Sequence, residues 1–348
     1  MLPLKAYLYG IKNIKHSLKG DPKAPGPVHM QIEPTSMCNL HCKMCPREES
    51  PYELQKHMPF SRLVHILDTY PSLKRVMLSG LGEPFMNRDI FKMLHEIKRR
   101  KIYLEMVSNG TLITEEIAEK IVKSNVNKIT ISIDGVKEYK NIRGANIEAC
   151  LRGLTNLCNA KKRLHGKLHI FINTVVLEQN MEDLENLIDV LKSFDVTWRL
   201  KSIRPTAGLN RVTNQDDKIK TLMKKAKRKG LKSICHKFEP APFCYRIYMG
   251  AAINWKGDMS PCCDNFTKVG NEDGWNSDAF TAFRNKFISG ELPEACKVCN
   301  LGFNARVHKY VKGLNKASYQ KIEREQKYSN TALSGAKIAT IKATPHER

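Results

Sequence analysis

The 348-residue sequence contains no apolar run that approaches the roughly 18 residues a membrane-spanning helix needs. Residues 1–7 lack a long apolar segment and a small-residue cleavage site, so no secretory signal is indicated. The sequence also has no internal repeat, no glycine-rich phosphate loop ending in Lys-Ser or Lys-Thr, and no paired-histidine zinc-protease motif. We therefore expect a cytoplasmic protein without a transmembrane segment.

Negative charge is scarce as well. The chain has 58 Lys and Arg against 35 Asp and Glu, which gives a formal net charge of +23. This excess favours an anionic partner, either nucleic acid, a phosphorylated metabolite or an acidic membrane surface. A hydrophobic content of 41% and a charged content of 27% are typical of a folded chain. The length predicts two domains, or one large domain with an appendage.

Cysteine, in contrast, is abundant, with eleven residues. Disulfides are disfavoured in a reducing compartment, so clustered thiols there indicate metal binding or catalysis. Cys150, Cys158 and Cys235 stand apart, and the other eight form two groups toward opposite ends of the chain. Cys150 and Cys158 share a predicted helix over 147–163, where we expect buried, inert thiols.

Strand and helix patterns alternate between residues 28 and 205. Apolar or β-branched runs predict strands at 29–33, 75–79, 102–107, 128–133, 168–176 and 198–203. Amphipathic stretches near 60–70, 88–100, 114–124, 147–163 and 181–193 predict the connecting helices. This alternation predicts a parallel α/β sheet or barrel, which binds its ligands at the carboxyl ends of the strands. The residues that follow these ends are Cys38, Gly80, Asn109, Asp134 and Arg204.

The rest of the chain has four parts. They are a basic lead-in at 1–27, a basic connector at 206–240, a small cysteine-bearing module at 241–302, and a basic, partly disordered tail at 303–348. Lys256-Gly257-Asp258 predicts a hairpin turn inside the module. The lead-in contains a helix pattern that either caps the main domain or lies on a membrane surface. The connector contains a lysine-rich helix with either a solvated basic face or an anion-binding surface.

The first cysteine group follows the first predicted strand. Cys38, Cys42 and Cys45 form a C-x3-C-x2-C loop, and thiolates favour zinc, copper(I) or iron–sulfur clusters. Structural zinc needs a fourth local ligand, and the candidate, His41, lies awkwardly between two of the others. Three ligands on a four-iron cluster leave one iron open for a reactant.

These residues resemble the cluster motif of the radical S-adenosylmethionine (radical SAM) enzymes. Ser79-Gly80-Leu81-Gly82-Glu83-Pro84 resembles the family's Gly-Gly-Glu-Pro segment, with Leu81 inserted between the glycines. Ser108–Thr111, Ser132–Gly135 and Arg143-Gly144 are similar to further family motifs. The resemblance covers about residues 28–205, the radical SAM core. It implies a partial (β/α)6 TIM-type barrel, a 4Fe–4S cluster that binds SAM, and a 5′-deoxyadenosyl radical that abstracts hydrogen from substrate.

The resemblance also implies contacts with SAM. Gly80 and Gly82 are expected to let the backbone approach the methionine amine, and Glu83 offers an acceptor to that amine or to the ribose. Arg143 is suited to the methionine carboxylate, with Ser132 as a second donor. The expected cofactor-binding residues are Met44, Gly80, Gly82, Glu83, Pro84, Asn109, Ser132, Asp134 and Arg143.

The second cysteine group lies in the terminal module, and four convergent thiolates there can hold zinc or a 4Fe–4S cluster. The expected ligands are Cys244, Cys262, Cys296 and Cys299. The pattern resembles the auxiliary-cluster domains called SPASM and Twitch, and most resembles the 2-deoxy-scyllo-inosamine dehydrogenase group. No cysteine follows Cys299, so the one-cluster form is expected, acting in electron transfer. The spare thiol, Cys263, is either a structural neighbour or a hydrogen-atom donor for an epimerase.

The sequence therefore predicts a radical SAM oxidoreductase or isomerase, which dehydrogenates or epimerises a small polar or anionic, sugar- or nucleotide-like substrate. Alternatives are radical modification of a nucleic acid or of a ribosomally made peptide, and a non-enzymatic zinc protein that binds nucleic acid. The family implies a one-electron reductant such as flavodoxin or ferredoxin. Arg204, Asn109 and Asp264 are substrate-binding candidates by position.

Overall fold

The computed structural model describes residues 19–47, 56–202, 216–235, 246–263 and 267–289, with a few single residues outside these ranges. Cys299, Arg204, Asp264 and the tail at 303–348 lie outside the described residues, as does about half of the lead-in. The described residues belong to one compact unit, except Cys244, which belongs to a second unit.

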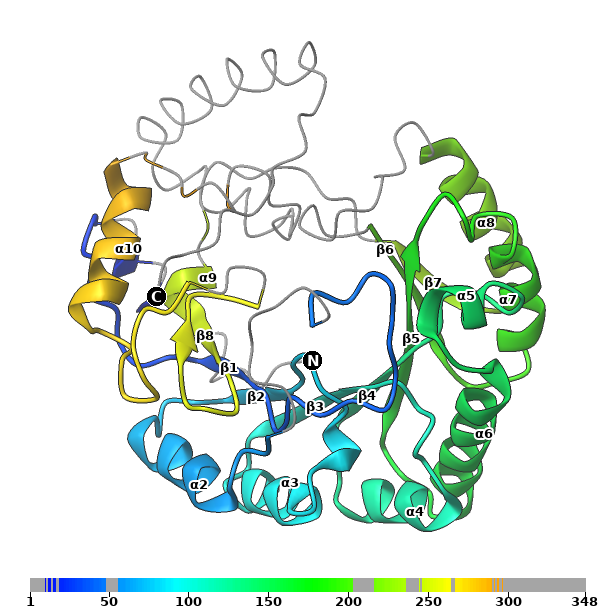
Figure 1. Ribbon diagram of the computed structural model, residues 1–348, viewed down its shortest axis with the longest axis horizontal. Helices are drawn as coiled ribbons and strands as arrows, with labels where there is room; N and C mark the ends of the chain where they lie inside the picture. The colour runs from blue at the N-terminus through cyan, green and yellow to red at the C-terminus, as the bar shows by residue number, and fades with distance from the viewer. Residues whose placement is uncertain are drawn as a thin grey trace. The chain divides into compact units, whose positions relative to one another are not determined.

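The described strands form a nine-stranded open sheet (Figure 1). They are β1 (His29–Ile32), β2 (Arg75–Leu78), β3 (Tyr103–Ser108), β4 (Lys128–Ser132), β5 (His169–Val176), β6 (Thr197–Ser202), β7 (Lys232–Cys235), β8 (Gly250–Ile253) and β9 (Met259–Ser260). Their order is β7-β6-β5-β4-β3-β2-β1-β8-β9. Every neighbouring pair is parallel except β8 and β9, so the carboxyl ends of β1 to β8 share one edge of the sheet.

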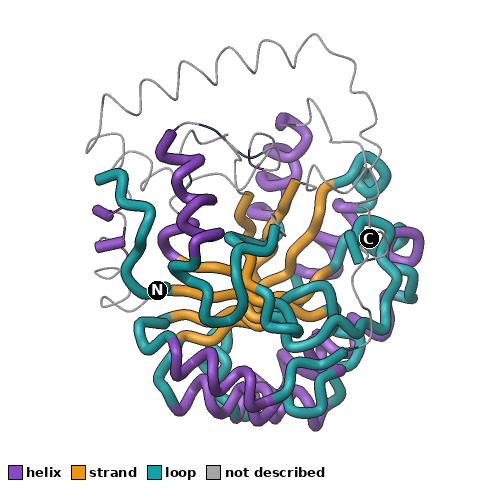
Figure 2. Tube along the Cα trace, turned by 60° about the vertical axis from the view of Figure 1, so that its left-hand side comes forward, coloured by secondary structure: helices purple, strands orange, loops and turns teal. Residues whose placement is uncertain are grey.

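Helices alternate with the strands along the chain. They are α2 (Phe60–Thr69), η1 (Pro84–Met86), α3 (Ile90–Arg99), α4 (Glu115–Lys123), α5 (Tyr139–Arg143), α6 (Ile147–Arg163), α7 (Leu184–Leu191), α8 (Asp216–Arg228), α9 (Arg246–Met249) and α10 (Asp278–Ser289). Figure 1 shows that α2 to α8 cover the convex face of the curved sheet, and Figure 2 shows the same layering from another side. None of the helices among the described residues is long and apolar enough to cross a membrane.

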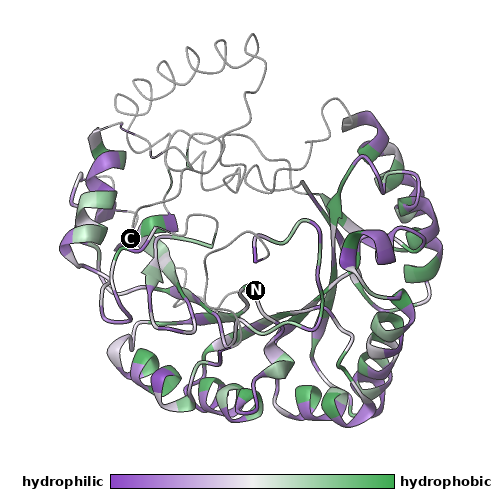
Figure 3. Ribbon diagram, in the orientation of Figure 1, coloured by the Kyte–Doolittle hydropathy of each residue, from purple (hydrophilic) through white to green (hydrophobic). Residues whose placement is uncertain are grey.

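The main core lies between the sheet and these helices. Ile129 and Ile131 of β4 are fully buried on the helix side, as are Ile121 of α4 and Leu154 of α6. Figure 3 shows the hydrophobic sides of the helices turned toward the sheet and their hydrophilic sides turned outward. This amphipathic pattern is what attaches each helix to the sheet. The opposite, concave face carries polar and charged residues.

The predicted fold class is confirmed: six parallel strands alternate with helices between residues 29 and 202. The predicted hairpin at residues 256–258 is also confirmed, with Gly257 at φ +93°, a conformation that favours glycine. The sheet extends beyond the prediction at both edges. β7 pairs with β6, and β8, from the cysteine-bearing module, pairs in parallel with β1.

A buried arginine ties α10 to the rest of this unit. Arg284 is fully buried and donates hydrogen bonds to the carbonyl oxygens of Pro22 and Ile247, both at 3.0 Å. Asn276, just before α10, exchanges two hydrogen bonds with the backbone of Ala24, at 2.9 and 3.0 Å. Segments from both ends of the described chain are therefore joined through polar contacts to backbone groups.

Candidate active site

The C-x3-C-x2-C loop leaves the carboxyl end of β1 and follows the buried carboxylate of Glu33. Cys42 is 8% exposed, while Cys38 and Cys45 are half-buried. The backbone N–H of Cys45 donates to the carbonyl of Cys42 at 2.9 Å, which makes a tight turn between these two thiols. The strand end and this turn together present all three cysteines at the edge where parallel sheets bind ligands.

The three thiols lie within electrostatic range of one another. Burial raises the pKa of Cys38, Cys42 and Cys45, and the nearby thiols raise it further. Arg143 and Arg47 act in the opposite direction, because their positive charges favour thiolates. Among the described residues, no three His, Cys, Asp or Glu side chains are arranged to hold a single metal ion. An all-thiol donor set beside two arginines fits the ligand chemistry of an iron–sulfur cluster.

Arg47 stabilises the cysteine loop through hydrogen bonds to its backbone. Its side chain is buried and donates to the carbonyl oxygens of Cys38 at 3.3 Å and Leu40 at 3.1 Å. Sequence reasoning missed this residue. The available signal was a basic residue two positions after the third cysteine, but an arginine there is equally typical of an exposed surface.

The loop after β2 packs directly on the cysteine loop. A Cβ on Gly82 would lie 2.2 Å from the carbonyl oxygen of Thr35, and a Cβ on Gly80 would lie 2.3 Å from the side chain of Glu33. The same carboxylate accepts a hydrogen bond from the N–H of Leu81 at 2.6 Å. The sequence predicted that these glycines make room for the methionine amine. In the structure, the neighbouring loop fills the space that a Cβ would take, so the glycines are also needed for loop packing. Their approach to the methionine amine stays a prediction.

Glu83 lies next in this loop and is 2% exposed. Its carboxylate accepts hydrogen bonds from Ser108 Oγ at 2.8 Å and from the N–H of Asn109 at 2.7 Å. Burial raises the pKa of Glu83 to about 7, although these hydrogen bonds oppose the shift. Pro84 is buried as the first residue of η1. The Glu83 carboxylate therefore joins the loops after β2 and β3. Its predicted contact with SAM stays a prediction.

Asn109 connects the β3 loop to the cysteines. Its Nδ2 donates to Asn39 Oδ1 at 2.8 Å and lies 3.9 Å from Cys38 Sγ, while its Oδ1 accepts from Thr111. Three of the residues predicted to share one face, Cys38, Gly80 and Asn109, are thus brought together in three neighbouring loops.

Arg143 stands between a carboxylate and a thiol. Its Nε donates to Asp134 at 2.6 Å, and its other end, Nη1, lies 3.8 Å from Cys42 Sγ. Burial alone lowers the pKa of Arg143, but the charges of Asp134 and Cys42 raise it above its ordinary value. Asp134 is fully buried and also accepts from the N–H of Val175 at 2.6 Å. The predicted role of Asp134 in binding SAM stays a prediction.

Two further predicted residues border this region. Met44 and Val175 pack against Ile142 and Leu177, which form a small apolar cluster beside the cysteine loop. Ser132 is the half-buried last residue of β4. Their predicted contacts with SAM remain predictions.

The second cysteine group is described only in part. Cys262 and Cys263 follow β9, and both are half-buried, as is Cys296. Cys244 is half-buried in the second unit, and Cys299 lies outside the described residues. The predicted convergence of four thiols remains a prediction.

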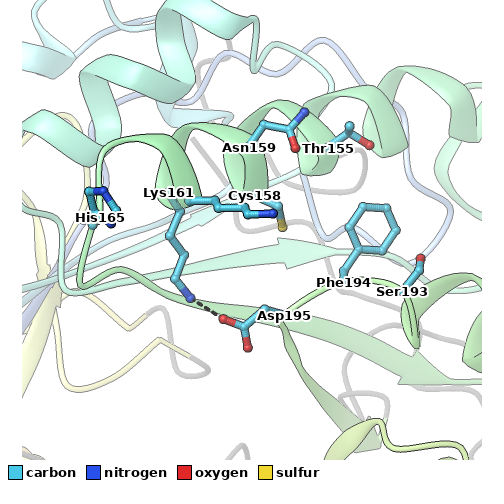
Figure 4. A pocket seen from close by; sticks show the side chains of 10 residues that line it. Thr155, Cys158, Asn159, Lys161, His165, Ser193, Phe194 and Asp195 are labelled. Carbon is cyan, nitrogen blue, oxygen red and sulfur yellow. Dashed lines mark hydrogen bonds and ion pairs between the residues drawn. The ribbon is translucent and has the colours of Figure 1, made fainter.

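The isolated cysteines behave differently from one another. Cys150 is fully buried, and burial raises its pKa to about 12, as expected of an inert thiol. Cys158 is half-buried, and burial raises its pKa to about 11. It lines a surface pocket of about 740 Å³ at the end of α6, where Lys161 pairs with Asp195 at 2.7 Å (Figure 4). This pocket lies toward the amino ends of the strands, away from the cysteine loop. Cys235 is exposed on β7.

Comparison with known proteins relates both segments to described families. Residues 32–191 match the radical SAM superfamily, and residues 244–300 match SPASM, an iron–sulfur cluster-binding domain. The chain is 28% identical over 183 residues to the tungsten-containing aldehyde ferredoxin oxidoreductase cofactor-modifying protein of Pyrococcus furiosus, covering 50% of this chain and 51% of that protein. It is 27% identical over 251 residues to the AdoMet-dependent heme synthase of Nitratidesulfovibrio vulgaris, covering 67% of this chain and 64% of that protein.

The chain thus spans about half of the first relative and just under two thirds of the second. Among solved structures, Streptococcus suis SuiB bound to its precursor peptide SuiA matches with a TM-score of 0.64 at 18% identity, covering 86% of this chain and 76% of SuiB. At this identity, the likeness concerns the fold. The chain therefore matches the radical SAM superfamily, whose members use a 4Fe–4S cluster and SAM, over residues 32–191, and the SPASM iron–sulfur cluster-binding domain over residues 244–300.

Proposed function

We propose that this protein is an enzyme that cleaves SAM reductively and abstracts hydrogen from a small polar or anionic substrate, which it dehydrogenates or epimerises. The observation that carries this proposal is the placement of Cys38, Cys42 and Cys45 at the carboxyl edge of the sheet, with Arg143 beside Cys42. A bound cluster and SAM would supply the 5′-deoxyadenosyl radical.

The protein residues around the cysteines then have separate roles. Cys38, Cys42 and Cys45 hold the cluster, and Arg47 keeps their loop in shape while its charge favours thiolates. Asp134 occupies Nε of Arg143, which orients the remaining guanidinium nitrogens. These nitrogens are suited to the carboxylate of SAM, because guanidinium and carboxylate groups form paired hydrogen bonds.

The SPASM domain separates the two candidate outcomes. Cys244, Cys262, Cys296 and Cys299 would hold one cluster, which would supply a one-electron acceptor; a substrate radical that loses this electron and a proton would complete a dehydrogenation. If Cys263 instead donates a hydrogen atom to the substrate radical, the reaction would be an epimerisation, and the thiyl radical left on Cys263 would need one electron from the reductant and a proton to return to the thiol. Radical SAM enzymes use a one-electron reductant, and we expect flavodoxin or ferredoxin in this role. The cytoplasmic location stays a prediction.

A peptide substrate is the second candidate. It is favoured by the fold match to SuiB, which was solved with its precursor peptide. Nucleic acid is less favoured by the described basic residues, because part of the positive charge of α8 is already neutralised. Lys225 and Lys229 pair with Glu185 and Asp189 of α7.

Anaerobic reconstitution with iron, sulfide, SAM and a reductant tests the proposal. We expect wild-type protein to form 5′-deoxyadenosine and Cys42→Ala to form none, with Cys158→Ala as the matched cysteine control that retains it. A panel of sugars, nucleotides and peptides identifies the substrate class by an increase in this product. Formation of 5′-deoxyadenosine by Cys42→Ala at the wild-type rate would overturn the proposal.

A further inference from the structure

The concave face of the sheet carries a group of charged side chains that the proposed chemistry does not use. Strand residues alternate between the two faces, and Val76, Leu104, Ile129, Ile170 and Trp198 are buried on the helix side. Their neighbours lie on the concave face. We call these the concave cluster: Arg75 of β2, Glu105 of β3, Lys128 of β4, Phe171 of β5 and Arg199 of β6.

The concave cluster has more positive charge than negative charge. Glu105 is 6% exposed and bonds Arg75 at 2.7 Å and Lys128 at 2.8 Å, both through Oε2. One carboxylate therefore faces three cations, counting Arg199. His29, the first residue of β1, adds no charge, because burial and the nearby Arg75 and Arg246 lower its pKa to about 3.

Arg199 is the cation that this carboxylate leaves without an ion pair. Its guanidinium stacks 4.6 Å from the ring centre of Phe171, and Lys128 Nζ lies 5.3 Å from the same ring. Nε of Arg199 is buried and has no hydrogen-bond partner among the described residues. Burial lowers the pKa of both Arg199 and Lys128, because desolvation disfavours a cation, and the charge of Glu105 only partly opposes this shift.

A second buried polar group, a hydrogen-bond acceptor, lies on the strand next to Arg199. Asn173 of β5 is directly opposite Arg199 in the strand register, and its buried Oδ1 also has no partner among the described residues. Native structures rarely leave such groups unsatisfied, so each calls for an explanation. A ligand that presents an anionic oxygen next to a hydroxyl group satisfies both at once.

We propose that the concave cluster binds an anionic group of the substrate, a carboxylate or a phosphate, through Arg199 and Lys128, with Asn173 accepting a neighbouring hydroxyl. This inference rests on the proposed function for the identity of the ligand as substrate. Arg199 lies three residues before the carboxyl end of β6, which corresponds to about 10 Å along the strand. In the strand register, however, the Arg199–Asn173 pair lies level with Ser132, the last residue of β4, so a bound anion would lie close to the carboxyl ends of the central strands.

Binding of inorganic phosphate and of succinate tests this site directly. Each anion is titrated into wild-type protein at constant ionic strength, and the thermal midpoint is measured, because a ligand that binds only folded protein raises it. We expect one of the two anions to stabilise wild type and thereby to identify the group. In Arg199→Gln, the apparent dissociation constant should rise at least about tenfold, because a charge-assisted hydrogen bond is lost.

Two further variants keep the test decisive. Arg163→Gln, on the outer helix α6 with a side chain 58% exposed, is the matched control and should bind as wild type does. If Arg199→Gln does not fold, Arg199→Lys replaces it, which keeps the cation but loses the paired geometry and should weaken binding. Stabilisation of wild type by neither anion, or equal stabilisation of all variants, would overturn the inference.

The proposed function is measured separately, as 5′-deoxyadenosine formed by wild-type protein. Anion binding without this product would leave the concave site standing and remove the radical chemistry. Formation of 5′-deoxyadenosine without anion binding would leave the radical chemistry standing and remove the concave site.

Discussion

Asp134 holds Arg143 through a 2.6 Å hydrogen bond to Nε, and the same guanidinium reaches to within 3.8 Å of Cys42 Sγ. The side chains of this pair are 0% and 13% exposed, so the ion pair is largely shielded from solvent. A carboxylate on the loop after β4 thereby determines where a positive charge lies beside the cysteine loop.

Asp134→Asn should destabilise the folded protein strongly. It leaves the buried Arg143 without its opposing charge, and breaking a buried pair costs about 3–5 kcal/mol. The free energy of unfolding, measured by anaerobic urea denaturation, checks this value. The matched control is Glu116→Gln, which breaks the exposed pair with Lys120 and should cost less than about 1 kcal/mol. Similar losses in the free energy of unfolding of both variants would show that the Asp134–Arg143 pair contributes no more than an exposed pair.

Gly82→Ala should disrupt the cysteine loop. The added Cβ would lie 2.2 Å from the Thr35 carbonyl and 2.6 Å from that of Met37, and neither backbone can move without shifting the loop. We expect a loss of about 1–3 kcal/mol in the free energy of unfolding and less iron bound after reconstitution. Gly230→Ala is the control, because its surroundings are open and only its φ of +77° opposes the change. Iron content equal in the two variants would contradict the packing argument.

Glu83 should make stability depend on pH. Its pKa is about 7 in the folded protein, against an ordinary 4.5, so the folded state holds the proton more tightly than the unfolded state. The contribution of protonated Glu83 to the free energy of unfolding is therefore complete below about pH 4.5. It is lost as the pH rises through about 7, with a limiting slope of about 1.4 kcal/mol per pH unit.

Glu83→Gln removes this titration. The free energy of unfolding of wild type relative to Glu83→Gln should fall between pH 5 and pH 8, as measured by denaturation at several pH values. A constant difference across this range would show that Glu83 does not titrate there.

Arg284→Met should destabilise the attachment of α10. The variant keeps a long apolar side chain but removes the donors to the carbonyls of Pro22 and Ile247. Each buried acceptor left unsatisfied costs about 1–3 kcal/mol, so we expect a loss of at least about 2 kcal/mol in chemical denaturation. Arg163→Met, at an exposed position, should change little. A loss as small as the control's would mean that water replaces the lost donors.

Much of the fold followed from local patterns in the sequence. Because parallel strands place their carboxyl ends along one edge, chain order alone predicted that Cys38, Asn109 and Asp134 would meet. The partners of these side chains were harder to predict. Glu33, for example, accepts a hydrogen bond from the N–H of Trp255, which lies 222 positions away in the sequence.

The strand β8 was equally hard to predict from the sequence. The segment Gly250–Ile253 is four residues long and contains glycine and two alanines, which have low strand propensity. It becomes a strand because it pairs with β1, and a Cβ at Gly250 would lie 2.0 Å from the carbonyl of His29. Tertiary pairing of this kind leaves no periodic signal. The concave cluster was also missed, because single charged residues in predicted strands are equally typical of a solvated face.

The most direct test of the central claim is the EPR spectrum of anaerobically reconstituted, reduced protein before and after SAM is added, together with iron and sulfide analysis. We expect the signal of a reduced four-iron cluster that changes when SAM binds and is absent from Cys42→Ala, with about eight irons per wild-type chain if the SPASM domain holds one cluster. A mononuclear ion at Cys38, Cys42 and Cys45, with a spectrum that SAM does not alter, would contradict the central claim.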